Sequence, residues 1–291
     1  MDAATRRAHA KVNLWLNVVG RRGDGYHLLH SLVAFCDLAD TVEARPAADL
    51  SLVLTGPTAG VLAGETDNLV LAAARALAAR AGVAPRAALA LTKRIPVAAG
   101  LAGGSADAAA ALRALADLWR VALPVEELFD LAASLGADVP MCLAGRAAIA
   151  SGIGERLEPA TELPPCSMLL VNPGVALPTA EVFAARRGPF SPVRPVDRTW
   201  RDLADLVEDL AARGNDLAAA AISLRPEIGA VLDLLRGSGG VRYAAMSGSG
   251  ATCFALCDDR AAAERVAAVL PAGWWRAVTG WASASSDHAF P

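Results

Sequence analysis

The sequence reads Pro96-Val-Ala-Ala-Gly100-Leu-Ala-Gly103-Gly104-Ser105-Ala-Asp107 between a short apolar run, 87–92, and an Ala- and Leu-rich run, 105–119. The two runs predict a strand and a helix, with Ser105 at the start of the helix. Glycines at such a junction let backbone N–H groups converge on an anion, and the helix dipole adds to the attraction. The segment therefore predicts a phosphate-binding loop, in which the Ser105 hydroxyl could bind a phosphate oxygen or a metal.

This loop belongs to neither of the two commonest phosphate-binding motifs. It lacks the Gly-Lys-Ser/Thr ending of a Walker A loop, and the chain has no G-x-G-x-x-G fingerprint. A different fold must therefore use the loop.

Lysine is rare in this chain, which draws attention to Lys11. Lys11 and Lys93 are the two lysines among 27 basic residues. Arginine is a wide planar fork that stays charged, whereas lysine is a compact point charge, so lysine is expected where arginine will not serve. Lys11 enters the run 12–19, which predicts a strand, and Asn13 is placed to orient it.

Two further segments carry candidate chemistry. Asp138, in Leu135-Gly-Ala-Asp138-Val-Pro140, lies between the end of a predicted helix, 125–135, and a proline. It is a candidate acid or base, although such a residue could also simply cap a helix or form a turn. Met246-Ser-Gly248-Ser-Gly250-Ala-Thr252 runs into an apolar strand, 253–257, and is either a second anion-binding loop or a flexible hairpin turn.

The remaining pattern predicts an α+β fold without a regular βαβ repeat. Further strands are expected at 50–54, 144–153 and 168–172. Further helices are expected at 67–81, with Asp67 or Asn68 as its cap, and at 200–212, 217–224, 227–236 and 260–270. Frequent prolines between residues 159 and 195 indicate a change of region, so we expect two domains, 1–158 and 159–291.

Bulk properties exclude several classes of protein. With 291 residues, 54% of them hydrophobic, the chain can bury a large core, and a net charge of −3 without a basic patch argues against nucleic-acid binding. Five cysteines without a C-x-x-C pair indicate reduced thiols in a cytoplasmic protein. The one long uncharged run, 163–180, holds four prolines, so no membrane helix is expected.

Taken together, these motifs resemble the GHMP kinase superfamily, which includes galactokinase, homoserine kinase and mevalonate kinase. Within the superfamily, the sequence resembles one branch most. That branch phosphorylates a hydroxyl of a cytidine diphosphate derivative in the methylerythritol phosphate route to isoprenoid precursors. The strings that carry the resemblance are Ala10-Lys-Val-Asn13-Leu, Gly23-Asp-Gly-Tyr26-His27, Asp67-Asn68-Leu69, Gly100 to Ser105, Leu135 to Pro140 and Asn172-Pro-Gly174. They span roughly residues 8 to 280.

The resemblance implies a two-domain kinase with its active site in the cleft between the domains, using ATP and Mg²⁺. It implies Lys11 and Asp138 as the catalytic residues, with the ammonium keeping the carboxylate ionised so that it can accept the hydroxyl proton. The nucleotide-binding residues implied are Asn68, Leu69, Lys93, Pro96, Val97, Ala98, Ala99, Gly100, Leu101, Ala102, Gly103, Gly104, Ser105 and Ala106. Those implied for the acceptor, a small molecule with a cytidine diphosphate group, are Asn13, Tyr26, His27, Thr179 and Phe183.

Some points stay open at this stage. The ligand of Mg²⁺ is not assigned, and we expect a monomer or a weak homodimer. Family loops usually read Gly-Leu-Gly-Gly-Gly-Ser-Ser, whereas here Ala102 replaces a glycine and Ala106 the second serine, so Ser105 alone keeps a hydroxyl. The alternatives are a GHMP kinase with another acceptor, such as mevalonate or homoserine, and a non-catalytic nucleotide sensor on the same fold.

Overall fold

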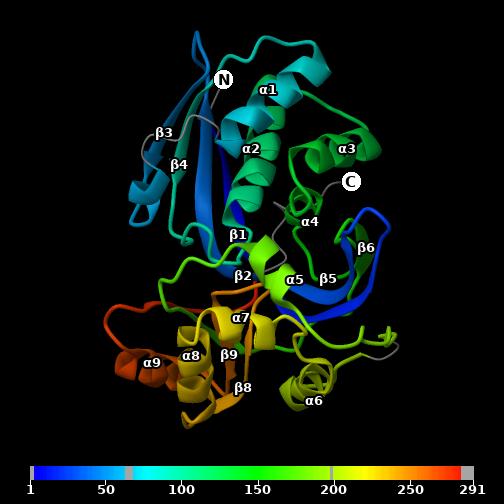
Figure 1. Cartoon of the computed structure of the whole chain (residues 1–291). Coiled ribbons are helices and arrows are strands. Elements are labelled where there is room, and N and C mark those ends of the chain that lie inside the picture. The colour runs from blue at the N-terminus through cyan, green and yellow to red at the C-terminus, as the bar shows by residue number, and fades with distance from the viewer. Residues whose placement is uncertain (1–2, 63–67, 197–198, 283–291) are drawn as a thin grey trace.

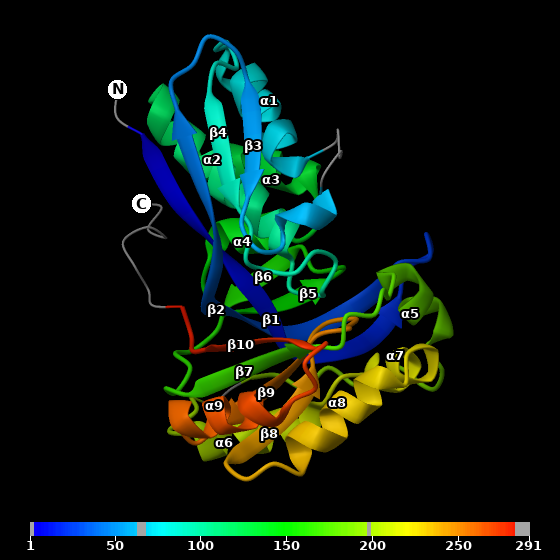
Figure 2. The ribbon, with the colours of Figure 1, turned by 90° about the vertical axis from the view of Figure 1, so that its left-hand side faces the viewer.

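The computed structural model describes residues 3–62, 68–196 and 199–282, folded into two sheets with helices packed on both (Figure 1, Figure 2). Asp67, one of the two predicted caps of the first helix, lies outside the described residues. Asn68 is the cap: its Oδ1 accepts a hydrogen bond of 2.9 Å from the backbone N–H of Val70. The mixture of helices with mainly antiparallel sheets confirms the predicted α+β class.

Two long antiparallel strands run through the molecule. β1 (Ala4–Arg21) pairs with β2 (His27–Arg45) along almost its full length. The predicted strand at 12–19 is the central part of β1, whereas the pattern along the chain does not predict β2. The middle of each strand is buried without interruption. A strand buried on both faces lacks the apolar–polar alternation by which strands are found in a sequence.

The first sheet has six strands in the order β3-β4-β2-β5-β6, with β1 also paired to β2. The strands that complete it are β3 (Ser51–Thr55), β4 (Ala88–Thr92), β5 (Ala148–Gly152) and β6 (Arg156–Pro159). β3 and β4 are parallel to each other and the other pairs are antiparallel. A 3₁₀ turn, Ala59–Leu62, follows β3.

Four helices accompany this sheet. They are α1 (Leu69–Ala81), α2 (Gly103–Trp119), α3 (Val125–Leu135) and α4 (Val139–Ala144). α2 is buried at every position from Ala106 to Leu115, and its many alanines let the sheet and α1 approach it closely. α4 was not expected, and it takes the first residue of the strand predicted at 144–153.

The start of α2 corrects one expectation. The helix begins at Gly103, two residues before the predicted start at Ser105, and its N-cap residue is Ala102, with a left-handed φ of 52°. No described side chain caps the helix. Its first N–H groups therefore have no side-chain acceptor, which is the condition that an anion-binding helix start requires.

The second sheet has four antiparallel strands in the order β10-β7-β9-β8. They are β7 (Ser167–Asn172), β8 (Val241–Met246), β9 (Cys253–Cys257) and β10 (Trp275–Thr279). Its helices are α5 (Thr179–Ala185), α6 (Leu203–Arg213), α7 (Ala218–Leu224), α8 (Glu227–Arg236) and α9 (Arg260–Val269). β9 and α8 have their predicted bounds, while the short elements β8, β10 and α5 show no periodic pattern and were not expected.

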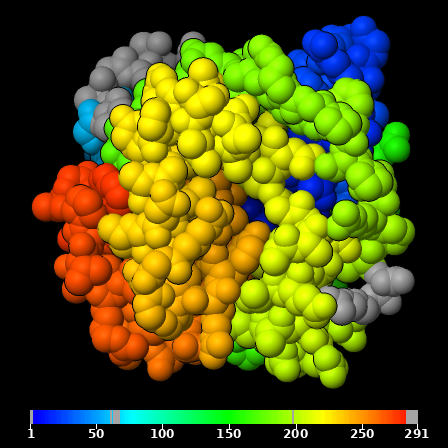
Figure 3. Space-filling model, turned by 60° about the horizontal axis from the view of Figure 1, so that its bottom comes forward, coloured from blue at the N-terminus to red at the C-terminus, as the bar shows by residue number. Residues whose placement is uncertain are grey.

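The two halves are joined by a shared core. Side chains of β1, such as Val12 and Leu14, are buried in one cluster with Leu170 and Phe254 of the second sheet. Farther along β1, Leu16 lies in the core of the second half. Seen from below, the yellow, yellow-green and orange segments of the second half surround a hollow in which blue atoms of the N-terminal part of the chain are visible (Figure 3). The division into domains 1–158 and 159–291 stays a proposal, because β1 contributes to both halves.

Candidate active site

The two residues predicted to be catalytic meet in the structure. Lys11 lies on β1 and Asp138 follows α3, yet the Lys11 Nζ is 3.4 Å from the Asp138 Oδ2. The lysine is buried, whereas the aspartate side chain is 42% exposed. Asp138 occupies the N-cap position of α4, but its side chain does not cap that helix. The carboxylate is therefore available both to the ammonium and to a group entering from solvent.

A polar network holds Lys11 in place. Its Nζ donates to Asn13 Oδ1 at 3.0 Å, and Asn13 Nδ2 donates to Ser31 Oγ at 2.8 Å. Ser31 in turn donates to the backbone carbonyl of Trp15 at 2.6 Å. Because Lys11 and Asn13 are two residues apart on a strand, their side chains lie on the same face. The pattern Lys11-Val-Asn13 thus places an orienting amide beside the ammonium, as the sequence predicts.

The two glycine loops pack against each other beside this network. Gly100 has a φ of +74°, and a Cβ built on it would lie 2.4 Å from the carbonyl oxygen of Gly250. A Cβ on Gly248 would lie 3.1 Å from Asn13 Oδ1. Ser247 Oγ accepts from the backbone N–H of Asn13 at 3.1 Å and donates to the Gly100 carbonyl at 3.3 Å. The second loop is a hairpin between β8 and β9, and its glycines are needed for this close packing.

A cavity of about 220 Å³ opens in front of the Lys11–Asp138 pair. It brings together residues of both halves, including Lys11, Asn13, Ser31, Gly100, Ala102, Asp138, Thr179, Phe183 and Ser249. Across it, Thr179 and Ser249 share a hydrogen bond of 2.8 Å between their hydroxyl groups, which joins the start of α5 to the second glycine loop. The pair predicted to carry the reaction therefore lies where the two halves meet.

A second cavity, of about 310 Å³, collects most of the residues predicted to bind the nucleotide. They are Asn68, Leu69, Lys93, Pro96, Val97, Ala98, Gly103 and Gly104, together with Leu62 and Asp107. The uncapped start of α2 lies in its wall, and a Cβ on Gly103 would come within 3.2 Å of Ile95. The cavity thus combines the uncapped N–H groups of the helix start with a wall that a side chain at position 103 would crowd.

Lys93, which lines this cavity, also belongs to a buried charge cluster. Its ammonium lies between two buried carboxylates, Asp40 and, at 2.7 Å, Asp107. Although burial alone would lower it, the pKa of Lys93 is raised by Asp107 and Asp40. Burial raises the pKa of the Asp107 carboxyl to about 7, against the opposing effect of Lys93. Lys93 is therefore part of a buried charge cluster that supports the wall of the cavity.

Three of the residues predicted to bind the nucleotide have their side chains in the core. Ala99, Leu101 and Ala106 are buried among apolar residues. The carbonyl of Leu101 accepts a hydrogen bond from the backbone N–H of Lys11 at 3.0 Å, so this residue shapes the site through its backbone. Ser105 lies half-buried in the first turn of α2.

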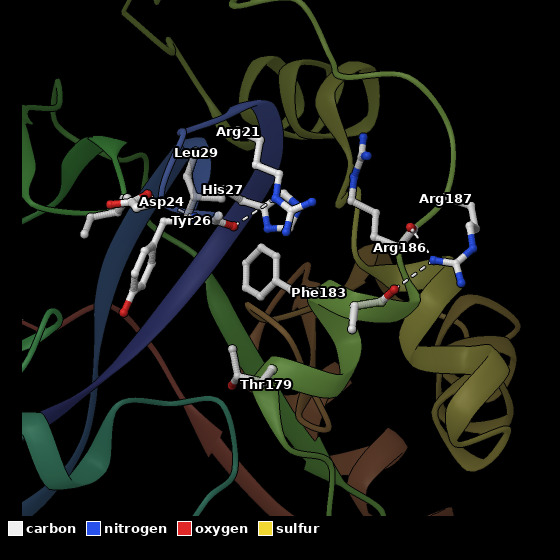
Figure 4. Close-up of a pocket in the computed structure, with 13 residues that line it drawn as sticks. Arg21, Asp24, Tyr26, His27, Leu29, Thr179, Phe183, Arg186 and Arg187 are labelled. Atoms are coloured by element: carbon white, nitrogen blue, oxygen red, sulfur yellow. Dashed lines mark hydrogen bonds between the residues drawn. The ribbon is translucent and has the colours of Figure 1, made fainter.

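The third and largest of these cavities, of about 1010 Å³, is lined by Tyr26, His27, Thr179 and Phe183, four of the five residues predicted for the acceptor (Figure 4). The fifth, Asn13, lines the cavity in front of Lys11 instead. The rings of His27 and Phe183 are stacked, with centroids 5.0 Å apart and planes 23° apart. Tyr26, beside them, is 62% exposed. Burial lowers the pKa of His27, and the neighbouring Arg21 and Arg186 lower it further. This cavity and the one in front of Lys11 share the lining residues Thr179 and Phe183, so the two adjoin.

Sequence reasoning missed several residues of the site. Ser31 and Asp40 lie on β2, which the pattern does not predict, so nothing placed them near the site. Asp107 and Ser249 stand inside the two glycine segments. The sequence could have drawn attention to Asp107 and Ser249 because they lie within these motifs. A motif does not show, however, which of its side chains faces a cavity.

Two features are absent from the described part of the chain. Within it, no group of three or more His, Cys, Asp or Glu side chains is arranged to hold a metal ion. None of the helices in the same residues is long and apolar enough to cross a membrane.

Family models and relatives identify the chain. Residues 68–146 match the family model described as "GHMP kinases N terminal domain", and residues 196–274 match "GHMP kinases C terminal". The chain is 52% identical over 278 residues to a 4-diphosphocytidyl-2-C-methyl-D-erythritol kinase of Paramagnetospirillum magneticum, covering 94% of this chain and 97% of that protein. It is also 52% identical to the enzyme of that name in Rhodospirillum rubrum, covering 94% and 91%.

Solved structures agree with this relationship. A crystal structure of 4-(cytidine 5'-diphospho)-2C-methyl-D-erythritol kinase is 39% identical and superposes with a TM-score of 0.78, covering 96% of this chain and all of that one. A homoserine kinase from Cytophaga hutchinsonii, at 18% identity and a TM-score of 0.68 over 97% and 95% of the two chains, shares the fold alone. The chain therefore belongs to the GHMP kinases and, within them, to the family of the 4-diphosphocytidyl-2-C-methyl-D-erythritol kinases.

Proposed function

We propose that this protein phosphorylates the 2-hydroxyl group of 4-diphosphocytidyl-2-C-methyl-D-erythritol with ATP, in the methylerythritol phosphate route to isoprenoid precursors. The observation that carries the proposal is the Lys11–Asp138 pair, 3.4 Å apart, in a cavity that adjoins a larger one lined by aromatic side chains. The names of the relatives above, at about half identity over nearly the whole chain, support the same acceptor.

The chain's own residues divide the chemistry between them. Asp138, half-exposed in the cavity, accepts the proton of the acceptor hydroxyl as the hydroxyl oxygen bonds to the terminal phosphorus of ATP and ADP leaves. The Lys11 ammonium, fixed by Asn13, offsets the negative charge that builds up during the transfer. Phosphoryl transfer depends mainly on positioning and electrostatics, so these few groups are sufficient on the protein side.

The cavity beside α2 fits the nucleotide. Its wall holds the uncapped helix start, Gly103, where an added Cβ would lie 3.2 Å from Ile95, and a buried Asp107 Oδ1 without a partner in the described residues. ATP, when bound, supplies the phosphoryl group. Mg²⁺ would accompany it and take most of its ligands from phosphate oxygens and water, so the protein needs to supply few of them. We assign no protein ligand to the ion.

The large cavity fits the cytidine end of the acceptor. The exposed ring of Tyr26 and the stacked rings of His27 and Phe183 offer faces on which a pyrimidine can stack. Because its pKa is lowered, the His27 imidazole is neutral at neutral pH and can both donate and accept a hydrogen bond. A cytoplasmic location and a monomeric or weakly dimeric state remain part of the proposal.

An assay of ADP release with three acceptors tests the proposed function. Turnover is expected with diphosphocytidyl-methylerythritol and not with mevalonate or homoserine. Tyr26→Ala should raise the KM for the cytidine compound and leave the KM for ATP unchanged. ADP release with mevalonate or homoserine at a comparable rate would overturn the assignment of the acceptor, and no release with any of the three would favour a non-catalytic sensor.

A further inference from the structure

Two arginines stand beside the stacked rings of the large cavity. Arg21 ends β1 and Arg186 directly follows α5, so the two come from different halves of the molecule. Both line the cavity that holds His27 and Phe183 (Figure 4). The fold therefore places two cationic side chains, one from each half, on the same cavity.

Each guanidinium is held in position by backbone carbonyls. Arg21 Nε donates to the carbonyl of Gly25 at 3.0 Å, and Arg186 Nη1 donates to that of Gly188 at 3.2 Å. Arg186 also lies over the ring of Phe190, with its Cζ 5.3 Å from the ring centroid. Carbonyl groups orient a guanidinium but do not neutralise its charge, so both residues keep a full positive charge in defined positions.

Neither arginine has an acidic partner within the described ranges of the chain. The carboxylate in the same cavity wall, Asp24, is bound at 2.7 Å by Arg22, which is not a lining residue. Arg21 and Arg186 both act on the His27 imidazole, whose pKa they lower in addition to the effect of burial. Two cations that act on the same imidazole and have no carboxylate partner create a positive potential in the cavity, which a bound anion would offset.

We propose that Arg21 and Arg186 together bind the diphosphate group of the acceptor, as a two-sided clamp between the halves of the molecule. This rests on the proposed function, which gives the acceptor its nucleoside diphosphate. A guanidinium offers paired N–H groups that match phosphate oxygens. The base then stacks near His27, and the rest of the acceptor reaches the Lys11–Asp138 pair through the adjoining cavity.

Steady-state kinetics of charge-removing variants test the clamp. Arg21→Gln and Arg186→Gln should each raise the KM for the acceptor about tenfold, because a charge-assisted contact is lost. The kcat at saturation and the KM for ATP should stay within twofold. The matched control is Arg156→Gln, which removes the same charge from an exposed residue of β6 outside the cavity. The KM of this control should not change.

Calorimetry with CDP and with cytidine separates the clamp from the proposed function. With the nucleotide site filled by a non-hydrolysable ATP analogue, the wild-type protein should bind CDP more tightly than cytidine. Arg186→Gln should weaken CDP about tenfold and cytidine less than twofold. Equal weakening of both ligands, or no weakening of either, would overturn the clamp. An absence of ADP release by the wild-type protein would overturn the proposed function, while the difference between CDP and cytidine would still decide the clamp.

Discussion

The two lysines of the chain occupy contrasting sites. Lys11 faces a cavity and shares a single half-exposed carboxylate, that of Asp138, at 3.4 Å. Lys93 is enclosed between two buried carboxylates, Asp40 and Asp107, in the wall of a different cavity. Both are buried, and both stand out in the sequence by rarity alone. In a chain that otherwise uses arginine, a lysine therefore indicates a position where only a compact cation fits. The charges around each lysine then determine its role.

The contrast has a physical basis in charge balance. A buried cation flanked by two acids is fixed in place, because moving it would leave buried carboxylates uncompensated. A cation with one half-exposed partner is only partly neutralised. It can therefore also stabilise negative charge that develops on the phosphoryl group during transfer. We infer that the Lys93 cluster supports the fold and that the Lys11 pair supports the reaction.

The largest expected effect is on turnover, at the acid beside Lys11. Asp138→Asn removes the proton acceptor, so kcat should fall about 10²–10⁴-fold. The free energy of unfolding should change by less than about 1 kcal/mol, because the side chain is half-exposed. ADP release and urea unfolding measure the two quantities. Near-normal turnover would show that Asp138 is not the base.

The matched change beside Lys93 should act on stability first. Asp107→Asn leaves a buried ammonium with one carboxylate, and we expect a loss of about 1–3 kcal/mol in the free energy of unfolding. Urea unfolding at neutral pH measures it. An unchanged unfolding midpoint would contradict the role of Asp107 in supporting the fold, and a large rate loss in the same variant would place Asp107 in the reaction instead.

The next effect concerns the first glycine segment, which lies between the Lys11 and Lys93 sites. Adding a side chain at Gly100 should reduce stability. Gly100→Ala places a methyl group against the Gly250 carbonyl at a positive φ, so a loss of about 1–3 kcal/mol in the free energy of unfolding is expected. The matched change is Gly104→Ala, where the nearest atom to a new Cβ is 3.7 Å away, on Leu69. Its stability should be unchanged or slightly raised, since alanine favours a helix. Equal losses in both variants would contradict the close packing of the loops.

The smallest expected effect concerns His27 and pH. Burial, Arg21 and Arg186 all lower its pKa below the ordinary 6.5, so the imidazole is protonated only under more acidic conditions. The KM for the acceptor should therefore change little above neutral pH and rise as the pH falls through the acidic range, where the imidazole takes up a proton. In Arg186→Gln the midpoint should move up toward 6.5. An NMR titration of the ring protons measures it, and a midpoint above 6.5 would contradict the arrangement.

Local patterns were enough to predict much of the fold and the centre of the site. The two glycine segments, the two lysines and Asp138 can each be picked out from a few neighbouring residues. Helices such as α3 and α8 show clear hydrophobic periodicity. Long-range pairing was not available from the sequence. β2, buried on both faces, shows no alternation, and so Ser31 and Asp40, which it carries, were not found.

The sequence predicted less well which residues of the first glycine segment face the cavity and which face the core. The reason is again a contact between distant parts of the chain. Ala99 and Ala106 belong to the first glycine segment, but their side chains face the core, and the helix begins before Ser105 instead of at it. Which face a loop residue presents depends on the packing of the second loop against the first, through Gly100 and Gly250. That packing joins segments about 150 residues apart, which no local pattern records.

Paired measurements on Lys11→Met and Lys93→Met test most directly whether the two lysine sites differ in role. Both variants keep a linear side chain and lose the charge. Lys11→Met should slow ADP release about 10²–10³-fold while changing the free energy of unfolding by less than about 1 kcal/mol. Lys93→Met should lose about 3–5 kcal/mol of stability, because two buried carboxylates are left without their cation. A Lys11→Met protein that turns over normally, or a Lys93→Met protein as stable as the wild type, would contradict this division between reaction and fold.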